Sequence, residues 1–368
     1  MRQIELPCLF MRAGTSRGPF FDAADLPDDP AARDAALIAA LGSSEDRRQI
    51  DGLGGGDSLT SKVAIVRRST HPGVDVDYLF AQVAVDGSYV DTSPSCGNML
   101  AGVGPFAIET GMVEAQDGET VVRIRDVNAR SLVEAVVQTP GREVAYAGDA
   151  RIDGVAAAAA PIALRFSNIV GSKTGAMLPT GRAIDDIDGR RVTCIDVATP
   201  MILIPAEDLG LTGYEAPDDL NARADLFADV ERIRRQAGLR MGLGDVSRTV
   251  LPKVALLAPP RAGGAICSRY LTPWTAHAAH AVTGAIGVAA ACAVPDTTAA
   301  RIAMPLHGAT FDIEHPAGKI GIRIDAVPGE GAPTIQSASV LRTARLLMRG
   351  AVAIPGPVAA KTLPSLAA

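Results

Sequence analysis

The sequence predicts an α+β protein made of two similar halves, in which a curled sheet surrounds a central helix in each half. The length of 368 residues favours two domains of ordinary size. Residues 97–113 and 275–293 are small-residue apolar segments with almost no charge after the first turn, so we expect two buried central helices. Strand-like segments flank both, without the βαβαβ alternation of a doubly wound sheet. We expect an N-terminal half over 1–187 and a C-terminal half over 188–368, with terminal strands that cross over.

The remaining elements follow from hydrophobic periodicity in chain order. Residues 4–11 form an apolar run that predicts a buried strand, and it ends at an expected turn over 12–18. Apolar spacing in residues 30–42 and 217–241 predicts two amphipathic helices. Alternation and short apolar runs bounded by turn residues predict strands at 62–67, 74–85, 89–90, 120–125, 131–138, 143–147, 162–166, 191–197, 253–258, 264–271, 300–327 and 336–353.

Composition excludes several classes of partner. The net charge of −6 and the aromatic content of 4% disfavour nucleic acid, which requires a basic surface or stacking platforms. The cysteines are widely spaced and odd in number, which is typical of reduced thiols in a cytoplasmic protein: Cys8, Cys96, Cys194, Cys267 and Cys292. No stretch has the pattern of a signal peptide or a membrane span, so we expect no membrane association.

Lys62 is the first candidate for catalysis. It follows a glycine-rich loop, Gly52–Gly56, and opens an apolar strand, where burial is expected to lower a lysine pKa toward that of a general base. The alternative is an ordinary solvated lysine at a strand end. The loop lacks the Lys-Ser/Thr ending of a phosphate-binding loop.

Cys96 is the second candidate, at the expected start of the first central helix. Backbone N–H groups of Gly97 and Asn98 at that helix start suit a carboxylate or an enolate oxygen. A buried structural thiol is the alternative for Cys96.

Hydroxyl and guanidinium groups in the 12–18 turn suggest carboxylate binding. Thr15, Ser16 and Arg17 are the candidates there, together with Ser61 beside Lys62. A plain surface loop is the alternative reading of this turn.

Histidines contribute one further candidate. His315 lies on an expected turn between late strands, where it could donate a hydrogen bond to the site or have no role. His277 and His280 lie one helical turn apart, but no third ligand is near in sequence, so we expect no metal site.

An ordered set of motifs resembles one family across nearly the whole chain. The segments are Leu9–Gly18, Gln49–Gly55, Thr60–Val66, Asp77–Val83, Cys96–Met99 with Val103–Ala107, Leu178–Gly181, and Glu314–Gly318. They are similar to the methylaconitate isomerase (PrpF-like) family. The resemblance implies a diaminopimelate-epimerase-like fold with the site between two halves, and a proton shift on an unsaturated di- or tricarboxylate without a cofactor. It places Lys62 and Cys96 at the positions of the catalytic pair.

The resemblance also narrows the chemistry. It implies a proton shift across an allylic or keto–enol unit, with 4-oxalomesaconate from gallate and protocatechuate breakdown as the preferred substrate. A 2-methylaconitate or aconitate cis–trans isomerase and a catalytically silent carboxylate-binding protein stay open. The chain departs from the family pattern at Ala13, Arg17 and Ala317. The second helix start carries no cysteine, which disfavours two-thiol racemisation, and the oligomeric state is not fixed, so a homodimer stays open.

Overall fold

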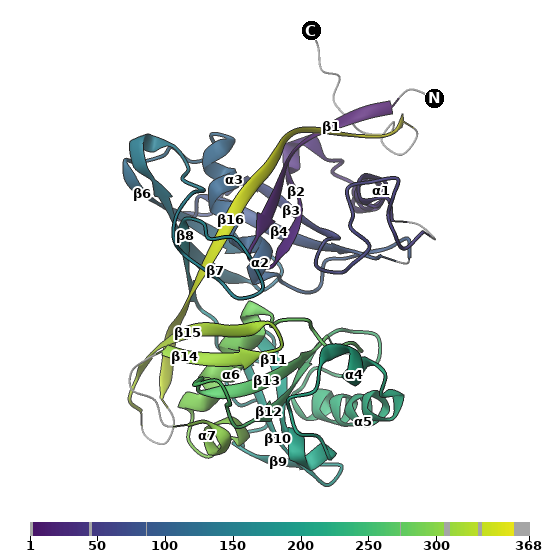
Figure 1. Cartoon of the computed structure of the whole chain (residues 1–368), viewed down its shortest axis with the longest axis vertical. Coiled ribbons are helices and arrows are strands. Elements are labelled where there is room, and N and C mark those ends of the chain that lie inside the picture. The colour runs from purple at the N-terminus through teal and green to yellow at the C-terminus, as the bar shows by residue number, and fades with distance from the viewer. Residues whose placement is uncertain are drawn as a thin grey trace. The chain divides into compact units, whose positions relative to one another are not determined.

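The chain folds into two compact units in a computed structural model that describes residues 3–43, 46–85, 87–272, 274–304, 310–329 and 333–356 (Figure 1). Unit 1 consists of Met1–Arg151, Ala157–Leu164 and Arg342–Ala368, and unit 2 consists of Ile152–Ala156 and Arg165–Leu341. This division differs from a boundary at 187/188, because residues 165–187 group with unit 2. The last strand also returns to unit 1, where it pairs with the first from Gln3↔Pro355 to Ala13↔Ala344.

Unit 1 is a curled sheet with helices on its two faces. Its elements are β1 (Gln3–Ala13), β2 (Ser16–Asp22), α1 (Pro30–Leu41), β3 (Lys62–Arg68), β4 (Val76–Val83), β5 (Val90–Asp91), α2 (Gly97–Leu100), α3 (Val103–Glu109), β6 (Gly118–Asp126), β7 (Ser131–Thr139), β8 (Pro161–Ser167) and the end of β16 (Thr334–Pro355). The pairing order is β1-β2-β3-β4-β6-β7-β8-β16, and β16 also pairs with β1, so the order of strands returns to its start as in a barrel.

Alternation of side chains along β2 and β3 separates the two faces of this sheet. Phe21, Val63 and Ile65 point to one face and pack with Leu37 and Leu41 of α1. Phe20 points to the opposite face and stacks on Phe106 of α3, with ring centroids 5.9 Å apart. The face that carries Phe20 is therefore the one that α2 and α3 cover, and Lys62 lies on it because β2 and β3 run parallel with Phe20 opposite Ala64.

The expected helix over 97–113 is wrong as a single helix and forms as two short ones. Pro105 has no N–H to donate to the carbonyl of Ala101, and its ring would clash with that carbonyl in a continuous helix. The helix therefore stops after Leu100, and Gly102 caps a new helix, α3. This break leaves Cys96 as the residue that precedes a helix of four residues.

Unit 2 repeats the plan of a sheet around an apolar helix. Its elements are β9 (Asp185–Ile187), β10 (Arg190–Val197), β11 (Thr199–Pro205), α4 (Pro217–Asn221), α5 (Ala224–Arg240), β12 (Lys253–Ala258), β13 (Ile266–Leu271), α6 (Val282–Ala293), α7 (Thr298–Ile302), β14 (Thr310–His315), β15 (Gly318–Val327) and the start of β16. The pairing order is β15-β14-β13-β12-β11-β10-β9. The buried helix α6 packs against β10, β11, β12, β14 and β15.

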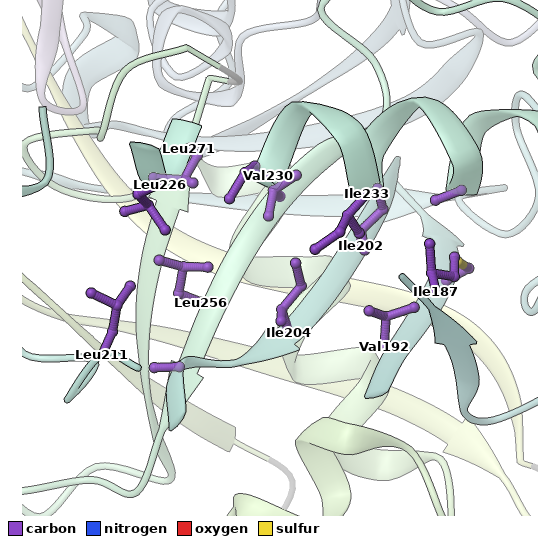
Figure 2. Close-up of a cluster of buried hydrophobic side chains, with 14 of the residues drawn as sticks. Ile187, Val192, Ile202, Ile204, Leu211, Leu226, Val230, Ile233, Leu256 and Leu271 are labelled. Carbon is purple, nitrogen blue, oxygen red and sulfur yellow. The ribbon is translucent and has the colours of Figure 1, made fainter. Parts of the chain in front are cut away.

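The opposite face of the unit 2 sheet is covered by α5. Figure 2 shows Leu226, Val230 and Ile233 of α5 directed at Ile202 and Leu256 of the strands. These side chains recur at helical spacing along α5, so they form one apolar stripe that faces the sheet.

The second central helix starts later than 275 because local hydrogen bonds hold residues 275–281 in another conformation. The His277 N–H donates to the Tyr270 carbonyl, and His277 Nδ1 accepts from the Ala279 N–H at 2.9 Å. These bonds take backbone groups that a helix would use. Helix α6 begins at Val282, so His277 and His280 are not helical neighbours, contrary to the expectation.

Four other segments also differ from the expectation. The expected turn over 12–18 is a two-residue hairpin turn, because Gly14 has a φ of 54° and Ala13 pairs with Ser16. Residues 143–147 do not form a strand, and β11 was not expected. Residues 300–302 belong to α7, which the Thr297 side chain caps by accepting from Ala300 N–H.

Candidate active site

Lys62 opens β3 on the face of the unit 1 sheet that α2 and α3 cover. Its ammonium group lies over the Phe80 ring of β4, 5.3 Å from the centroid. Among the described residues, no carboxylate lies within ion-pairing distance of Lys62 Nζ. The Lys62 amine therefore has no carboxylate of the described chain beside it.

Cys96 lies against this lysine. Lys62 Nζ is 3.5 Å from Cys96 Sγ, which is hydrogen-bonding distance for a sulfur atom. The cysteine is buried at 8% exposure and precedes α2, while Lys62 comes from a strand 34 residues earlier in the chain. The contact joins an amine and a thiol between which a proton can pass.

Gly18 decides how closely β2 approaches Lys62. A Cβ at Gly18 would lie 1.7 Å from the Lys62 carbonyl oxygen, so only glycine fits this position without a shift of backbone. Gly18 therefore allows the backbone of β2 to lie close to the backbone of β3 at Lys62.

Tyr78 and Asp126 fix the segment that carries Cys96. The Tyr78 hydroxyl donates to the Cys96 carbonyl at 3.1 Å, and the Ser95 hydroxyl donates to the Asp126 carboxylate. Tyr78 was missed in the sequence, because no local spacing relates it to Cys96. The pairing of β4 with β6 places Tyr78 opposite Asp126, and local spacing in the sequence does not show this pairing.

Thr15 and Asn98 form a second contact between the hairpin turn and α2. Asn98 Nδ2 donates to Thr15 Oγ1 at 3.1 Å, and Asn98 Oδ1 lies 3.5 Å from the Thr15 N–H. Gly14 makes room for this carboxamide, because a Cβ there would lie 2.2 Å from Asn98 Oδ1. Gly97 lies between Cys96 and Asn98 and is buried.

Ser16 has a buried hydroxyl on the same face as Lys62. The residue is 2% exposed, and its Oγ has no hydrogen-bond partner among the described residues. It lies one residue after Thr15 and two before Gly18, whose neighbour across the strands is Lys62. A buried hydroxyl without a partner carries a free-energy cost that a bound polar group would relieve.

The structure does not bring Arg17 and Ser61 to this cluster. Arg17 points to the opposite face of β2, where its guanidinium lies 5.7 Å from the centre of the Phe10 ring. The Ser61 hydroxyl lies 2.6 Å from Gln49 Oε1 and 2.9 Å from the Asp57 carbonyl, so the preceding loop occupies it.

His315 belongs to unit 2, at the end of β14. It is buried at 8% exposure, and its Nδ1 accepts from the Ala317 N–H at 3.2 Å. The following glycine, Gly318, has a φ of 129°, and a Cβ there would lie 2.1 Å from Asp153 Oδ2. This close approach explains why the His-Pro motif ends in glycine.

The described part of the chain has neither a metal-binding cluster nor a membrane-spanning helix. No group of three or more His, Cys, Asp or Glu side chains is arranged to hold a metal ion within the described ranges. None of the helices described is both long enough and apolar enough to cross a bilayer.

The two-unit fold is shared with a class of isomerases. The chain is similar over 99% of its length, and of the other chain, to a solved methylitaconate-delta-isomerase, with 35% identity and a TM-score of 0.81. This likeness confirms the expected fold class and the isomerase class.

The chain belongs to the PrpF protein family, whose model matches residues 3–355. A (4E)-oxalomesaconate Delta-isomerase of Novosphingobium sp. (strain KA1) is 51% identical, over 94% of this chain and 96% of the relative. A 4-oxalomesaconate tautomerase of Pseudomonas putida is 47% identical, over 96% of this chain and 97% of the relative. The family expected from the motifs is therefore confirmed.

Proposed function

We propose that the protein is an isomerase that needs no cofactor and moves a proton within 4-oxalomesaconate or a closely related unsaturated polycarboxylate. The observation that carries the proposal is the 3.5 Å contact between Lys62 Nζ and Cys96 Sγ, on the face of the unit 1 sheet that α2 and α3 cover. The names of the two oxalomesaconate enzymes, at 51% and 47% identity, support the choice of substrate.

The proton shift needs one group that takes a proton from carbon and a conjugate acid that returns it elsewhere. A basic Lys62 amine removes a C–H proton next to a carbonyl, and the C–H electron pair moves into the conjugated system to give a dienolate. The lysine ammonium, or the Cys96 thiol beside it, then delivers a proton to another carbon or to oxygen. The atoms balance because the product is an isomer, and the pair regains its starting protonation by transfer across the Nζ–Sγ contact.

The substrate carboxylates need polar groups near this pair. Ser16 supplies a buried hydroxyl without a partner among the described residues. The preceding residue, Thr15, supplies a second hydroxyl, and Asn98 supplies the carboxamide that is hydrogen-bonded to it. We propose that these three side chains, with the backbone of Gly97, bind the substrate. Arg17 lies over Phe10 and Ser61 is hydrogen-bonded by Gln49 and Asp57, so we do not include these two residues in the substrate site. His315 stays a proposed contact from unit 2.

The first experiment measures turnover of 4-oxalomesaconate by absorbance and by NMR in D2O. Wild type is expected to turn over and to incorporate deuterium at carbon. Lys62→Met is expected to lose about 10²- to 10⁴-fold in kcat, the usual contribution of a general acid–base group. Lys173→Met is the matched control, because Lys173 is an exposed lysine of unit 2, and it is expected to keep wild-type activity.

A substrate panel tests the choice of carboxylate. The solved relative named methylitaconate-delta-isomerase favours an allylic isomerase as the second candidate. Turnover of 2-methylaconitate without turnover of 4-oxalomesaconate would move the proposal to that branch. Tight binding of both compounds without turnover of either would instead support a carboxylate-binding protein.

Two further proposals concern the setting of the enzyme. All five cysteines are free thiols in the structure, which supports a cytoplasmic location. A homodimer stays a proposal that sedimentation analysis of the purified protein would test.

A further inference from the structure

Gln49 has an unusual conformation for its surroundings. Its backbone φ is 53°, a left-handed value that side chains other than glycine rarely adopt, and the residue is only 1% exposed. Such a conformation persists only where the surrounding structure holds it in place. The contacts of the Gln49 side chain hold this backbone conformation in place.

The carboxamide of Gln49 joins three segments of unit 1. Its Oε1 accepts from the Ser61 hydroxyl at 2.6 Å and from the Gly56 N–H at 2.9 Å. Its Nε2 donates to Ser43 Oγ at 2.8 Å, and the Ser43 hydroxyl donates to the Ala84 carbonyl. Both ends of the carboxamide are thus satisfied by buried partners.

The glycine-rich loop Gly52–Gly56 packs closely against this side chain. A Cβ at Gly54 would lie 2.2 Å from Gln49 Oε1, so the loop passes too close to the carboxamide for any larger residue. The close packing gives the loop a structural role that does not involve phosphate binding. Gln49 and Gly54 are therefore in direct contact.

Ser61 transmits this constraint to the strand that follows. Its side chain is held by Gln49, and its carbonyl accepts from the Val83 N–H at 3.1 Å and from Gln82 Nε2 at 3.0 Å. The next residue is Lys62, whose own carbonyl abuts Gly18. The backbone at the base of the lysine side chain is thereby fixed from both sides.

We propose that Gln49 is a positioning residue that holds Lys62 in contact with Cys96. The inference rests on the proposed function for its effect on turnover, although its effect on the Lys62–Cys96 geometry is independent of the substrate. Displacement of a catalytic group by about 1 Å can cost about 100-fold in rate.

Gln49→Gly is the first variant, because glycine accepts the left-handed backbone and the whole side chain, with its carboxamide, is removed. We expect kcat to fall by about tenfold or more, with KM within about twofold, because the substrate contacts at Ser16 are untouched. Ile50→Ala is the matched control, since Ile50 is the next residue of the same loop and is 69% exposed. It should keep wild-type kinetics.

A double-mutant cycle with Ser61→Ala tests the route. If Gln49 acts through Ser61, the double variant should have a kcat close to that of the worse single variant. Fully additive losses in kcat from the two single variants would contradict an action of Gln49 through Ser61. Gln49→Glu keeps both acceptor contacts of Oε1 and should recover part of the lost kcat.

Alkylation of Cys96 gives a readout that does not need turnover. The rate of iodoacetamide reaction at Cys96 is followed by peptide mass spectrometry across pH, with Lys62→Met as the reference for a thiol without its amine neighbour. The Gln49→Gly profile should move from that of wild type toward that of Lys62→Met. An unchanged profile together with unchanged kcat would overturn the proposal, whereas failure of wild type to turn over substrate would affect only the proposed function.

Discussion

The Tyr78 hydroxyl donates a hydrogen bond of 3.1 Å to the carbonyl oxygen of Cys96. Tyr78 lies on β4 and is completely buried, so this bond connects the centre of the sheet with the residue that precedes α2. Because burial raises the pKa of Tyr78 well above its ordinary value, with the Cys96 and Asp126 charges adding to it, the hydroxyl stays protonated and donates at every pH of use.

Tyr78→Phe should therefore loosen the Cys96 segment without creating a cavity. We expect the free energy of unfolding to fall by about 1 kcal/mol, the usual net value of one hydrogen bond, and kcat to fall severalfold. Urea unfolding and steady-state kinetics measure the two effects. A kcat ratio of variant to wild type that changes strongly between neutral and mildly alkaline pH would contradict a purely structural bond.

Gly18→Ala should displace β2 from β3. Its Cβ would lie 1.7 Å from the Lys62 carbonyl oxygen, and backbone cannot move aside as a flexible side chain can. We expect a loss of about 1–3 kcal/mol in stability and a larger loss in kcat than in binding. Gly350→Ala is the control, because a Cβ at that strand glycine meets nothing within 4 Å. Equal activity of the two variants would contradict the proposed role of Gly18.

The five thiols should differ sharply in reactivity. Burial raises the pKa of Cys8 to about 11, of Cys194 to about 12 and of Cys292 to about 12. Thiols react as thiolates, so these three should resist iodoacetamide near pH 8. Cys96 has Lys62 Nζ 3.5 Å from its Sγ, so it should react, and substrate should protect it. Peptide mass spectrometry reads each site, and the urea-unfolded protein, in which all sites should react, is the control. Faster labelling of Cys194 than of Cys96 would contradict this order.

Asp77 should contribute to stability in a pH-dependent way. Burial raises its pKa, but hydrogen bonds from Arg125, Ser69 and Arg67 outweigh it and lower the pKa to about 2. A depressed pKa gives stability that is present above the unfolded value of about 3.9 and is lost as pH falls through about 2.

Asp77→Asn should consequently be less stable than wild type at pH 7, with the difference shrinking as the pH falls from about 4 toward about 2. Urea unfolding at pH 7 and pH 3 measures the two differences. A gap that stays constant down to the acid limit would show that the carboxylate charge does not matter.

Much of the local structure could be predicted from the sequence because it depends on short-range patterns. The apolar spacing of residues 30–42 gave helix α1, and the alternation over 131–138 gave strand β7. The small, uncharged residues of α6 indicated a helix buried on all sides. Lys62 and Cys96 are candidates from the sequence because each stands at a recognisable position, a strand start after a glycine loop and a residue before an apolar helix segment.

Only the tertiary structure decided which of these residues meet. The parallel register of β2 with β3 places Gly18 against Lys62 and turns Arg17 to the opposite face, a distinction that one residue of slippage would reverse. The hydrogen bonds between Tyr78 and Cys96 and between Ser61 and Gln49 join residues that are 18 and 12 positions apart, and no periodic pattern in the sequence predicts them. Sequence determines what each segment prefers locally, whereas the contacts that fix the candidate site arise from strand pairing and from close approaches that only glycine permits.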